Sequence, residues 1–206
     1  TIPAFCKDEI LVVVEEAHTA GIKVAAHAIG GSAMRWALEA GVDSIEHANL
    51  IVEDDIEWFV NSGAWISDPN LQMFLDPERG TDVRPDNRDL PAWWREKVRL
   101  SREQTRTVLP KAIEAGVKVA LGTDCNHGQL WREAACLADL GVRPMDVIAS
   151  VTCSGAELCG IADQVGTLEP GKVADLICVK GNPMEDIRVL RDIHLVMSRG
   201  EVLQGV

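Results

Sequence analysis

A short motif that recurs four times decides the fold, and its first copy reads Ala20-Gly21-Ile22-Lys23-Val24-Ala25-Ala26-His27. The second copy reads Ala40-Gly41-Val42-Asp43-Ser44-Ile45-Glu46-His47, and the third reads Ser62-Gly63-Ala64-Trp65-Ile66-Ser67-Asp68-Pro69. The fourth runs Ala115-Gly116-Val117-Lys118-Val119-Ala120-Leu121-Gly122-Thr123-Asp124. In each copy a glycine precedes a short apolar stretch, which is typical of a strand that is buried on both faces.

A helix-like segment precedes each copy of the motif. In the first segment Ile10, Val14 and Ala17 share one helical face, and Asp8 is placed to cap the start. In the third, the acidic residues 53–55 suit the positive end of a helix dipole. The glycine of each copy lies where a helix ends in a left-handed residue, a conformation that glycine adopts at little cost.

The alternation of helix, glycine and buried strand predicts βα units and a parallel sheet. Short strands of similar design favour a (β/α)₈ barrel over a doubly wound sheet. Such a barrel needs about 250 residues, whereas this chain has 206 residues and four such strands. Since half a barrel would leave unpaired strand edges, we expect an upstream half to be missing or cleaved.

The remaining segments complete the predicted domain organisation. Leu71 to Leu90 contains several Pro, Gly and Asp residues and is predicted to be a loop. Loops of this length often form a lid over a site. Pro91 opens a long helix to about Glu114, which Pro110 is expected to break or kink. We predict a barrel half over residues 1–165 and part of a small β domain over residues 166–206. The other predicted elements are helices at 129–140, 144–151 and 155–159 and strands at 173–179, 193–198 and 201–203.

Two histidines and one aspartate mark the candidate site. His27 and His47 end their strands six residues after the glycine of each motif, and Asp124 ends the fourth strand. All strands of a parallel barrel point one way, so these side chains should meet at the C-terminal rim, where barrel enzymes place their active sites. Two imidazoles and a carboxylate form a zinc-type ligand set. The alternative is that both histidines serve the structure only.

Neighbouring residues are weaker candidates. His127 follows Asp124 in a predicted βα loop and either contacts substrate or lies on the surface. Glu46 points away from His47 if the strand alternates regularly, so a structural role is favoured. Asp68 ends the third strand and could face the site.

Composition excludes several classes of function. The net charge of −12 and the isoelectric point near 4.8 argue against binding to nucleic acid or to an anionic membrane. The sequence holds neither an apolar run of about 18 residues nor a signal-peptide pattern. None of the six cysteines forms a Cys-x-x-Cys pair, so we expect reduced thiols and a cytoplasmic protein, unless a missing N-terminal part carries a signal peptide.

These motifs resemble the amidohydrolase superfamily. Residues 24–28, 40–47 and 122–124 look like its fifth, sixth and eighth strands, and residues 166–176 resemble the entry into its β-sandwich domain. The prolidase-like branch of Xaa-Pro and Xaa-Arg dipeptidases is the most similar, and imidazolonepropionase is more distant. The resemblance implies an α/β fold comprising strands 5 to 8 of a TIM-type barrel and part of a small β-sandwich.

The resemblance also implies roles for the candidate residues. His27, His47 and Asp124 would ligate metal, and Asp124 would be the general base that later acts as the acid. Zn²⁺ is the implied cofactor, two ions per complete chain, although other divalent ions suit the same ligands. The His-x-His pair and the carboxylated lysine of the family have no counterpart here. The stretch 67–70 departs from the Pro-Thr-like sequence expected at the seventh strand.

The predicted function is metal-dependent hydrolysis of an amide bond in a dipeptide or an N-acyl amino acid. Two alternatives stay open: a one-metal deaminase or cyclic amidohydrolase, and an inactive fragment that lacks the N-terminal ligands. The isolated chain is predicted to be inactive. The expected partners are the small substrate and the missing half of the barrel, and assembly into a homo-oligomer is left open.

Overall fold

The computed structural model describes residues 2–76, 91–124 and 128–205. The chain divides into two compact units, Thr1–Val119 and Ala120–Val206, and each is described by itself. The predicted boundary between residues 165 and 166 stays a prediction.

A four-stranded sheet forms the centre of the first unit. Its strands lie in the order β1 (Ala25–Ala28), β2 (Ser44–His47), β3 (Trp65–Ser67) and β4 (Val119–Ala120). β1 pairs with β2 and β2 pairs with β3, and both pairs are parallel. The amide of Ile66 donates to the carbonyl of Lys118 over 2.9 Å, which aligns the start of β4 with β3. The motif therefore produces the predicted parallel strands.

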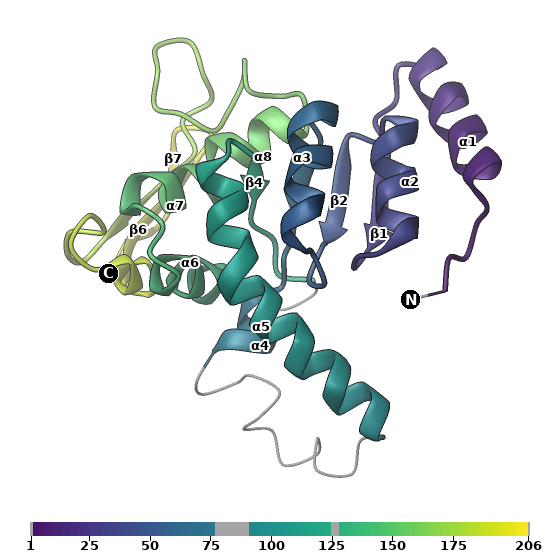
Figure 1. The fold of residues 1–206 in the computed structure, drawn as a ribbon. Helices are drawn as coiled ribbons and strands as arrows, with labels where there is room; N and C mark the ends of the chain where they lie inside the picture. Colours follow the sequence, from purple (N-terminus) through teal and green to yellow (C-terminus); the bar gives the residue numbers. More distant parts are fainter. Residues whose placement is uncertain (1, 77–90, 125–127, 206) are drawn as a thin grey trace. The chain divides into compact units, whose positions relative to one another are not determined.

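Helices connect these strands and cover the sheet. They are α1 (Lys7–Thr19), α2 (Ser32–Ala40), α3 (Glu53–Ser62), α4 (Leu71–Leu75) and α5 (Ala92–Glu114). α1 packs on α2 and α2 packs on α3, so the three lie next to one another in chain order (Figure 1). Gly41 and Gly63 end α2 and α3 with φ of 89° and 71°. The predicted left-handed glycine stops are thus confirmed.

The core of the first unit lies between the sheet and these helices. Each large apolar side chain buried there stabilises the fold by about 1.5–3 kcal/mol. The most deeply buried are Met34, Ile45, Ile51, Phe59, Ile66 and Leu71.

The start of α1 corrects one prediction. Cys6, not Asp8, is the N-cap residue, and the carboxylate of Glu9 accepts the Cys6 amide over 2.8 Å. This hydrogen bond lowers the pKa of Glu9. The helix begins before the expected cap because a glutamate three residues after Cys6 completes a capping box.

Around α4 and α5 two expectations were wrong, namely that the chain from Leu71 is a loop and that Pro110 breaks the helix, whereas the kink expected at Pro110 stays a prediction. The predicted loop begins with a helix, α4, while residues 77–90 lie outside the described part of the chain. α5 runs without a break through Pro110.

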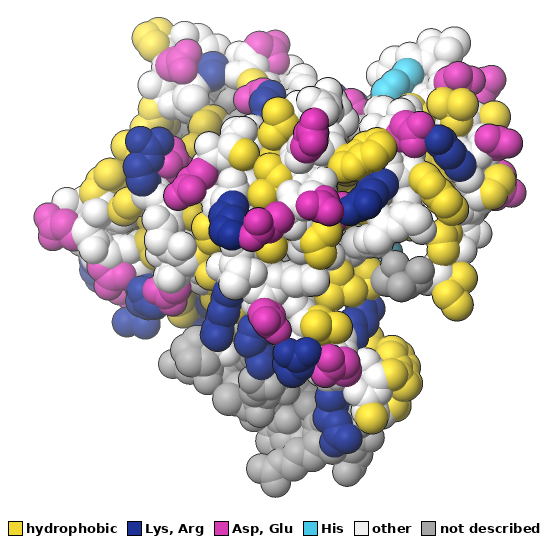
Figure 2. Space-filling model, viewed as in Figure 1, with side chains coloured by type: hydrophobic (Ala, Val, Ile, Leu, Met, Phe, Trp, Pro, Cys, Tyr) yellow, Lys and Arg dark blue, Asp and Glu magenta, His cyan; other side chains and the backbone are white. Residues whose placement is uncertain are grey.

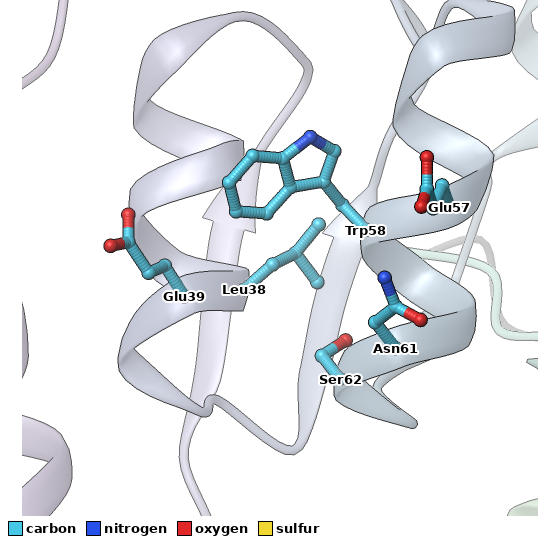
Figure 3. A pocket seen from close by; sticks show the side chains of 6 residues that line it. All are labelled: Leu38, Glu39, Glu57, Trp58, Asn61 and Ser62. Atoms are coloured by element: carbon cyan, nitrogen blue, oxygen red, sulfur yellow. The ribbon is translucent and has the colours of Figure 1, made fainter.

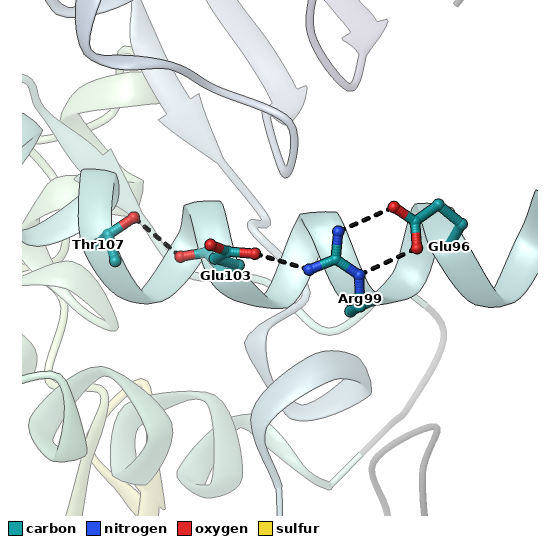
Figure 4. A network of polar contacts seen from close by, with 4 residues as sticks. All are labelled: Glu96, Arg99, Glu103 and Thr107. Carbon is teal, nitrogen blue, oxygen red and sulfur yellow. Dashed lines mark hydrogen bonds and ion pairs between the residues drawn. The ribbon is translucent and has the colours of Figure 1, made fainter.

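On the exposed surface of α5, Arg99 donates to both Glu96 and Glu103 over 2.8–2.9 Å (Figure 4). Such pairs stabilise a helix by about 0.2–0.5 kcal/mol each.

The second unit combines helices with an antiparallel sheet. Its helices are α6 (Leu130–Asp139), α7 (Pro144–Ser150) and α8 (Cys153–Leu158), and its strands lie in the order β5 (Leu176–Val179), β6 (Ile193–Ser198) and β7 (Glu201–Gly205). The short helix η2 (Ile187–Arg191) packs on α6, where Arg188 donates to both carboxylate oxygens of Asp139 over 2.8 and 2.7 Å. The predicted helices and strands are confirmed, with shifts of a few residues at their ends.

Charged side chains of both signs lie on the surface (Figure 2). On the face shown in Figure 2, basic side chains lie interspersed with acidic ones. Among the described residues, no helix has both the length and the apolar character that a membrane crossing requires.

Candidate metal centre

The structure brings two predicted site residues together at the carboxyl ends of the strands. His27 lies in β1 and His47 is the last residue of β2. Their ring centroids are 4.8 Å apart and the ring planes meet at 76°, an edge-to-face arrangement. The ring of His27 is exposed and that of His47 is half-buried, so both are placed where a ligand could reach them.

The histidines converge because β2 leaves the extended conformation at its last residue. Strand register pairs His27 with Glu46 and Ala28 with His47, so regular pleating would send the two histidine rings to opposite faces. His47 and Ala48 instead have φ of 77° and 50°. Residues other than glycine pay about 1–3 kcal/mol for such angles, which persist where the surroundings enforce them.

A hydrogen bond sets the protonation of the His47 ring. Its Nδ1 lies 2.9 Å from the backbone carbonyl oxygen of Asp68. A carbonyl can only accept, so Nδ1 carries a proton, and in the neutral ring the lone pair is then on Nε2. Metal-binding histidines are commonly oriented in this way by an acceptor on the second nitrogen.

Glu46 lies beside His47 in β2, and the hydroxyl of Ser44 donates to its carboxylate over 2.8 Å. The strand register pairs Glu46 with His27. The structural role expected for Glu46 remains a prediction.

The loops that follow the strands are joined to one another. The amide of Leu50 donates to the carbonyl of Ile29 over 2.6 Å, and a Cβ at Gly30 would lie 2.7 Å from the Leu50 carbonyl oxygen. Only glycine therefore fits at position 30 without a shift of the backbone. The side-chain amide of Asn49 donates to the carbonyl of Pro69 over 2.6 Å. The sequence reasoning missed Asn49, because a single asparagine after a histidine forms no recognisable motif.

Asp124 and His127 are the other predicted site residues. Asp124 belongs to the second unit, where it is exposed and has a φ of 42°. His127 lies outside the described residues. Within the described ranges, no three His, Cys, Asp or Glu side chains are grouped to hold a metal ion. The roles of His27, His47, Asp124 and His127 remain predictions.

The histidine pair nevertheless fits part of a metal site. Zinc in enzymes takes three protein ligands and one water, and imidazole nitrogen is a preferred donor. His47 presents Nε2 with its second nitrogen already satisfied, and the exposed His27 ring lies beside it. This pair can supply two donors, so further ligands must come from elsewhere.

A groove on the helical side of the first unit is separate from this centre. It has a volume of about 460 Å³ and lies between α2 and α3 (Figure 3). Its lining residues are Leu38, Glu39, Glu57, Trp58, Asn61 and Ser62. None of the candidate site residues lines it.

The chain is similar to known proteins of the amidohydrolase family. The family model described as "Amidohydrolase family" matches residues 2–203. A crystal structure of a Xaa-Pro dipeptidase with bound methionine in its active site is similar at 36% identity with a TM-score of 0.86, covering 98% of this chain and 49% of that one.

Two curated proteins extend the comparison. Ochratoxinase from Aspergillus niger is 27% identical over 209 residues, covering 98% of this chain and 42% of the relative. Imidazolonepropionase from Geobacillus kaustophilus is 45% identical over 74 residues, which cover 32% of this chain and 17% of the relative. The chain thus spans less than half the length of the ochratoxinase and about half that of the dipeptidase.

Proposed function

The chain belongs to the amidohydrolase family, and from this premise we propose that the complete protein hydrolyses the amide C–N bond of a dipeptide or an N-acyl amino acid. The mixed α/β fold is consistent with a fragment of an amidohydrolase barrel, since similar structures are matched over about half their length. Members of this family are generally metal-dependent hydrolases.

The observation that carries the proposal is the His27–His47 pair at the strand ends. Its rings are 4.8 Å apart, and His47 has its Nε2 available for a metal. The similarity to a Xaa-Pro dipeptidase supports a dipeptide-like substrate.

Each residue has a distinct chemical task in this proposal. His27 and His47 would hold Zn²⁺, and the chemistry that the bound ion would supply is a water with its pKa lowered to about 7. The carboxylate of Asp124 accepts the proton of the attacking water and later delivers it to the nitrogen of the leaving amine. His127 is proposed to contact the substrate.

The missing ligands are proposed to come from an upstream half of the barrel. In the described part of the chain, β1 has a strand partner on one side only. α1, which packs on α2, exposes the apolar residues Leu11, Val12 and Val13, whose exposed fractions are 43%, 56% and 56%. An upstream β/α segment that paired with β1 and covered α1 would bury these groups. We therefore propose that the isolated chain is inactive.

The test is the Asp124→Asn variant of the complete protein. Replacing the carboxylate removes the proton acceptor but keeps the side-chain shape, so turnover of dipeptides should fall by about 10²–10⁴-fold. The melting temperature should stay near that of the wild type. Asp163→Asn, at an exposed aspartate of the same unit, is the matched control and should keep full activity. Near-normal turnover by Asp124→Asn would refute the mechanism.

A second candidate is a one-metal deaminase or a cyclic amidohydrolase. The 45% identity with an imidazolonepropionase over 74 residues favours it. The two proposals are separated by measuring turnover of four substrate classes. These are dipeptides, N-acyl amino acids, cyclic amides and amino-substituted heterocycles. Turnover confined to the last two groups would replace the first proposal with this one.

A further inference from the structure

We propose that Asn49 is a positioning residue, which fixes the ring of His47 through the Asp68–Pro69 backbone. The inference rests on the proposed role of His47 as a metal ligand. It adds a residue that touches neither the metal nor the substrate.

Two parallel contacts join the loop after β2 to the loop after β3. The side-chain amide of Asn49 donates to the carbonyl oxygen of Pro69 over 2.6 Å, and Nδ1 of His47 donates to the carbonyl oxygen of Asp68 over 2.9 Å. The donors are two residues apart and the acceptors are consecutive carbonyls. One bond alone would let the acceptor loop pivot, whereas two bonds define the direction of the Asp68 carbonyl.

The Asp68–Pro69 backbone needs such a restraint. Asp68 and Asn70 have φ of 44° and 53°, in the left-handed region that side chains other than glycine disfavour. Pro69 between them is fully buried. A strained turn relaxes when a contact that holds it is removed, and the Asp68 carbonyl would then turn away from the His47 ring.

Asn49 is suited to hold this turn because it is itself immobilised. Only 5% of its surface is exposed, and the next residue along is fixed by the bond from the Leu50 amide to the Ile29 carbonyl. A buried side chain in a fixed loop keeps its donor in one place. In a variant that lacks this donor, the Pro69 carbonyl loses its hydrogen bond from Asn49, and the turn loses one of its two restraints.

The first experiment measures the tautomer of His47. Complete protein with ¹⁵N-labelled histidine, free of metal, is examined by NMR as wild type, Asn49→Ala and Asn49→Leu, and the His47→Gln spectrum assigns the signal. Wild type should show the proton on Nδ1 alone, and both variants should show a population with the proton on Nε2. Leucine has the same number and branching of side-chain heavy atoms as asparagine but no hydrogen-bond donor, so this variant fills the site if alanine destabilises the fold. Asn61→Ala, at an exposed asparagine of α3, should match the wild type.

The second experiment measures zinc affinity of the same proteins by competition with a chelator. Loss of a residue that orients a ligand should weaken binding by about 10–100-fold. If both variants melt earlier yet keep the Nδ1 proton and the wild-type affinity, Asn49 is merely structural and the proposal is overturned. If the wild type binds no zinc, the proposed function fails, while the tautomer measurement still decides whether Asn49 positions the ring.

Discussion

At the scale of single residues, Asp43 connects three segments near the amino ends of the strands. Its carboxylate accepts the amide of Val24 over 2.7 Å and Nε2 of His18 over 3.0 Å. Burial by itself raises the pKa of Asp43, but the hydrogen bonds from Val24 and His18 and the nearby positive charges together lower it. The charged form of Asp43 therefore stabilises the folded state.

The pH dependence of stability should show this contribution. The folded-state pKa lies below the ordinary value of 3.8, so the stabilisation is complete above that value and is lost as the pH falls through the folded-state pKa. We expect the melting temperature of the wild type to fall more steeply below about pH 4 than that of Asp43→Asn. Thermal unfolding between pH 7 and pH 3 measures the difference, and parallel curves would contradict this account.

The sequence could predict which histidines meet but not how they meet. The equal spacing of His27 and His47 from their glycines identified the pair. The strand register is offset by one residue, and the left-handed φ of His47 compensates for it. That angle depends on contacts with residues about twenty positions away, such as the Asp68 carbonyl. The sequence around His47 does not indicate which distant residues it will contact.

At the scale of elements, α2 and α3 are joined by an ion pair with one buried partner. Nε of Arg35 donates to Asp55 over 2.6 Å, and the other oxygen of Asp55 accepts the Val52 amide over 2.9 Å. The side chain of Asp55 is 1% exposed and that of Arg35 is 37% exposed. The hydrogen bond and charge of Asp55 raise the pKa of Arg35.

Removing the arginine should therefore cost more than removing a surface partner. Arg35→Ala leaves a buried carboxylate without its counter-charge, and we expect the free energy of unfolding to fall, by less than for a pair with both partners buried. Lys7→Ala, which breaks the exposed pair with Glu39, should cost at most about 1 kcal/mol. Urea unfolding compares the two variants. Equal losses would show that burial of Asp55 does not matter.

Helices were predictable where a local signal controls them and not where packing does. Gly41 and Gly63 end their helices as expected. Pro110 removes one backbone donor, yet α5 continues because Val108, Leu109 and Ala112 are buried on either side of it. α4 was missed because five residues are too short to show a helical period.

At the scale of the whole molecule, the count of strands predicted half a barrel. The chain covers 49% of a similar dipeptidase and 42% of an ochratoxinase, which agrees with that prediction. A two-metal ligand set could not be completed from this sequence, because His27, His47 and Asp124 would provide three donors, enough for one zinc ion with its water but not for two.

The metal content of the complete protein is the measurement that decides between the proposals. About two zinc ions per chain, found by elemental mass spectrometry, would support the two-metal peptidase and imply a bridging ligand upstream. At most one ion would favour the deaminase or cyclic amidohydrolase. Complete absence of metal from protein prepared without chelators would leave His27 and His47 as structural residues.

The free edge of β1 has a consequence for how the chain behaves when it is made alone. Edge strands often carry a lysine or a proline, which prevents pairing with another molecule. The four residues of β1, Ala25 to Ala28, include neither. In the described part of the chain, the edge has no strand beside it. Overproduction of the 206-residue chain by itself should therefore give inclusion bodies. Co-production of an upstream half that pairs with β1 should reduce this aggregation.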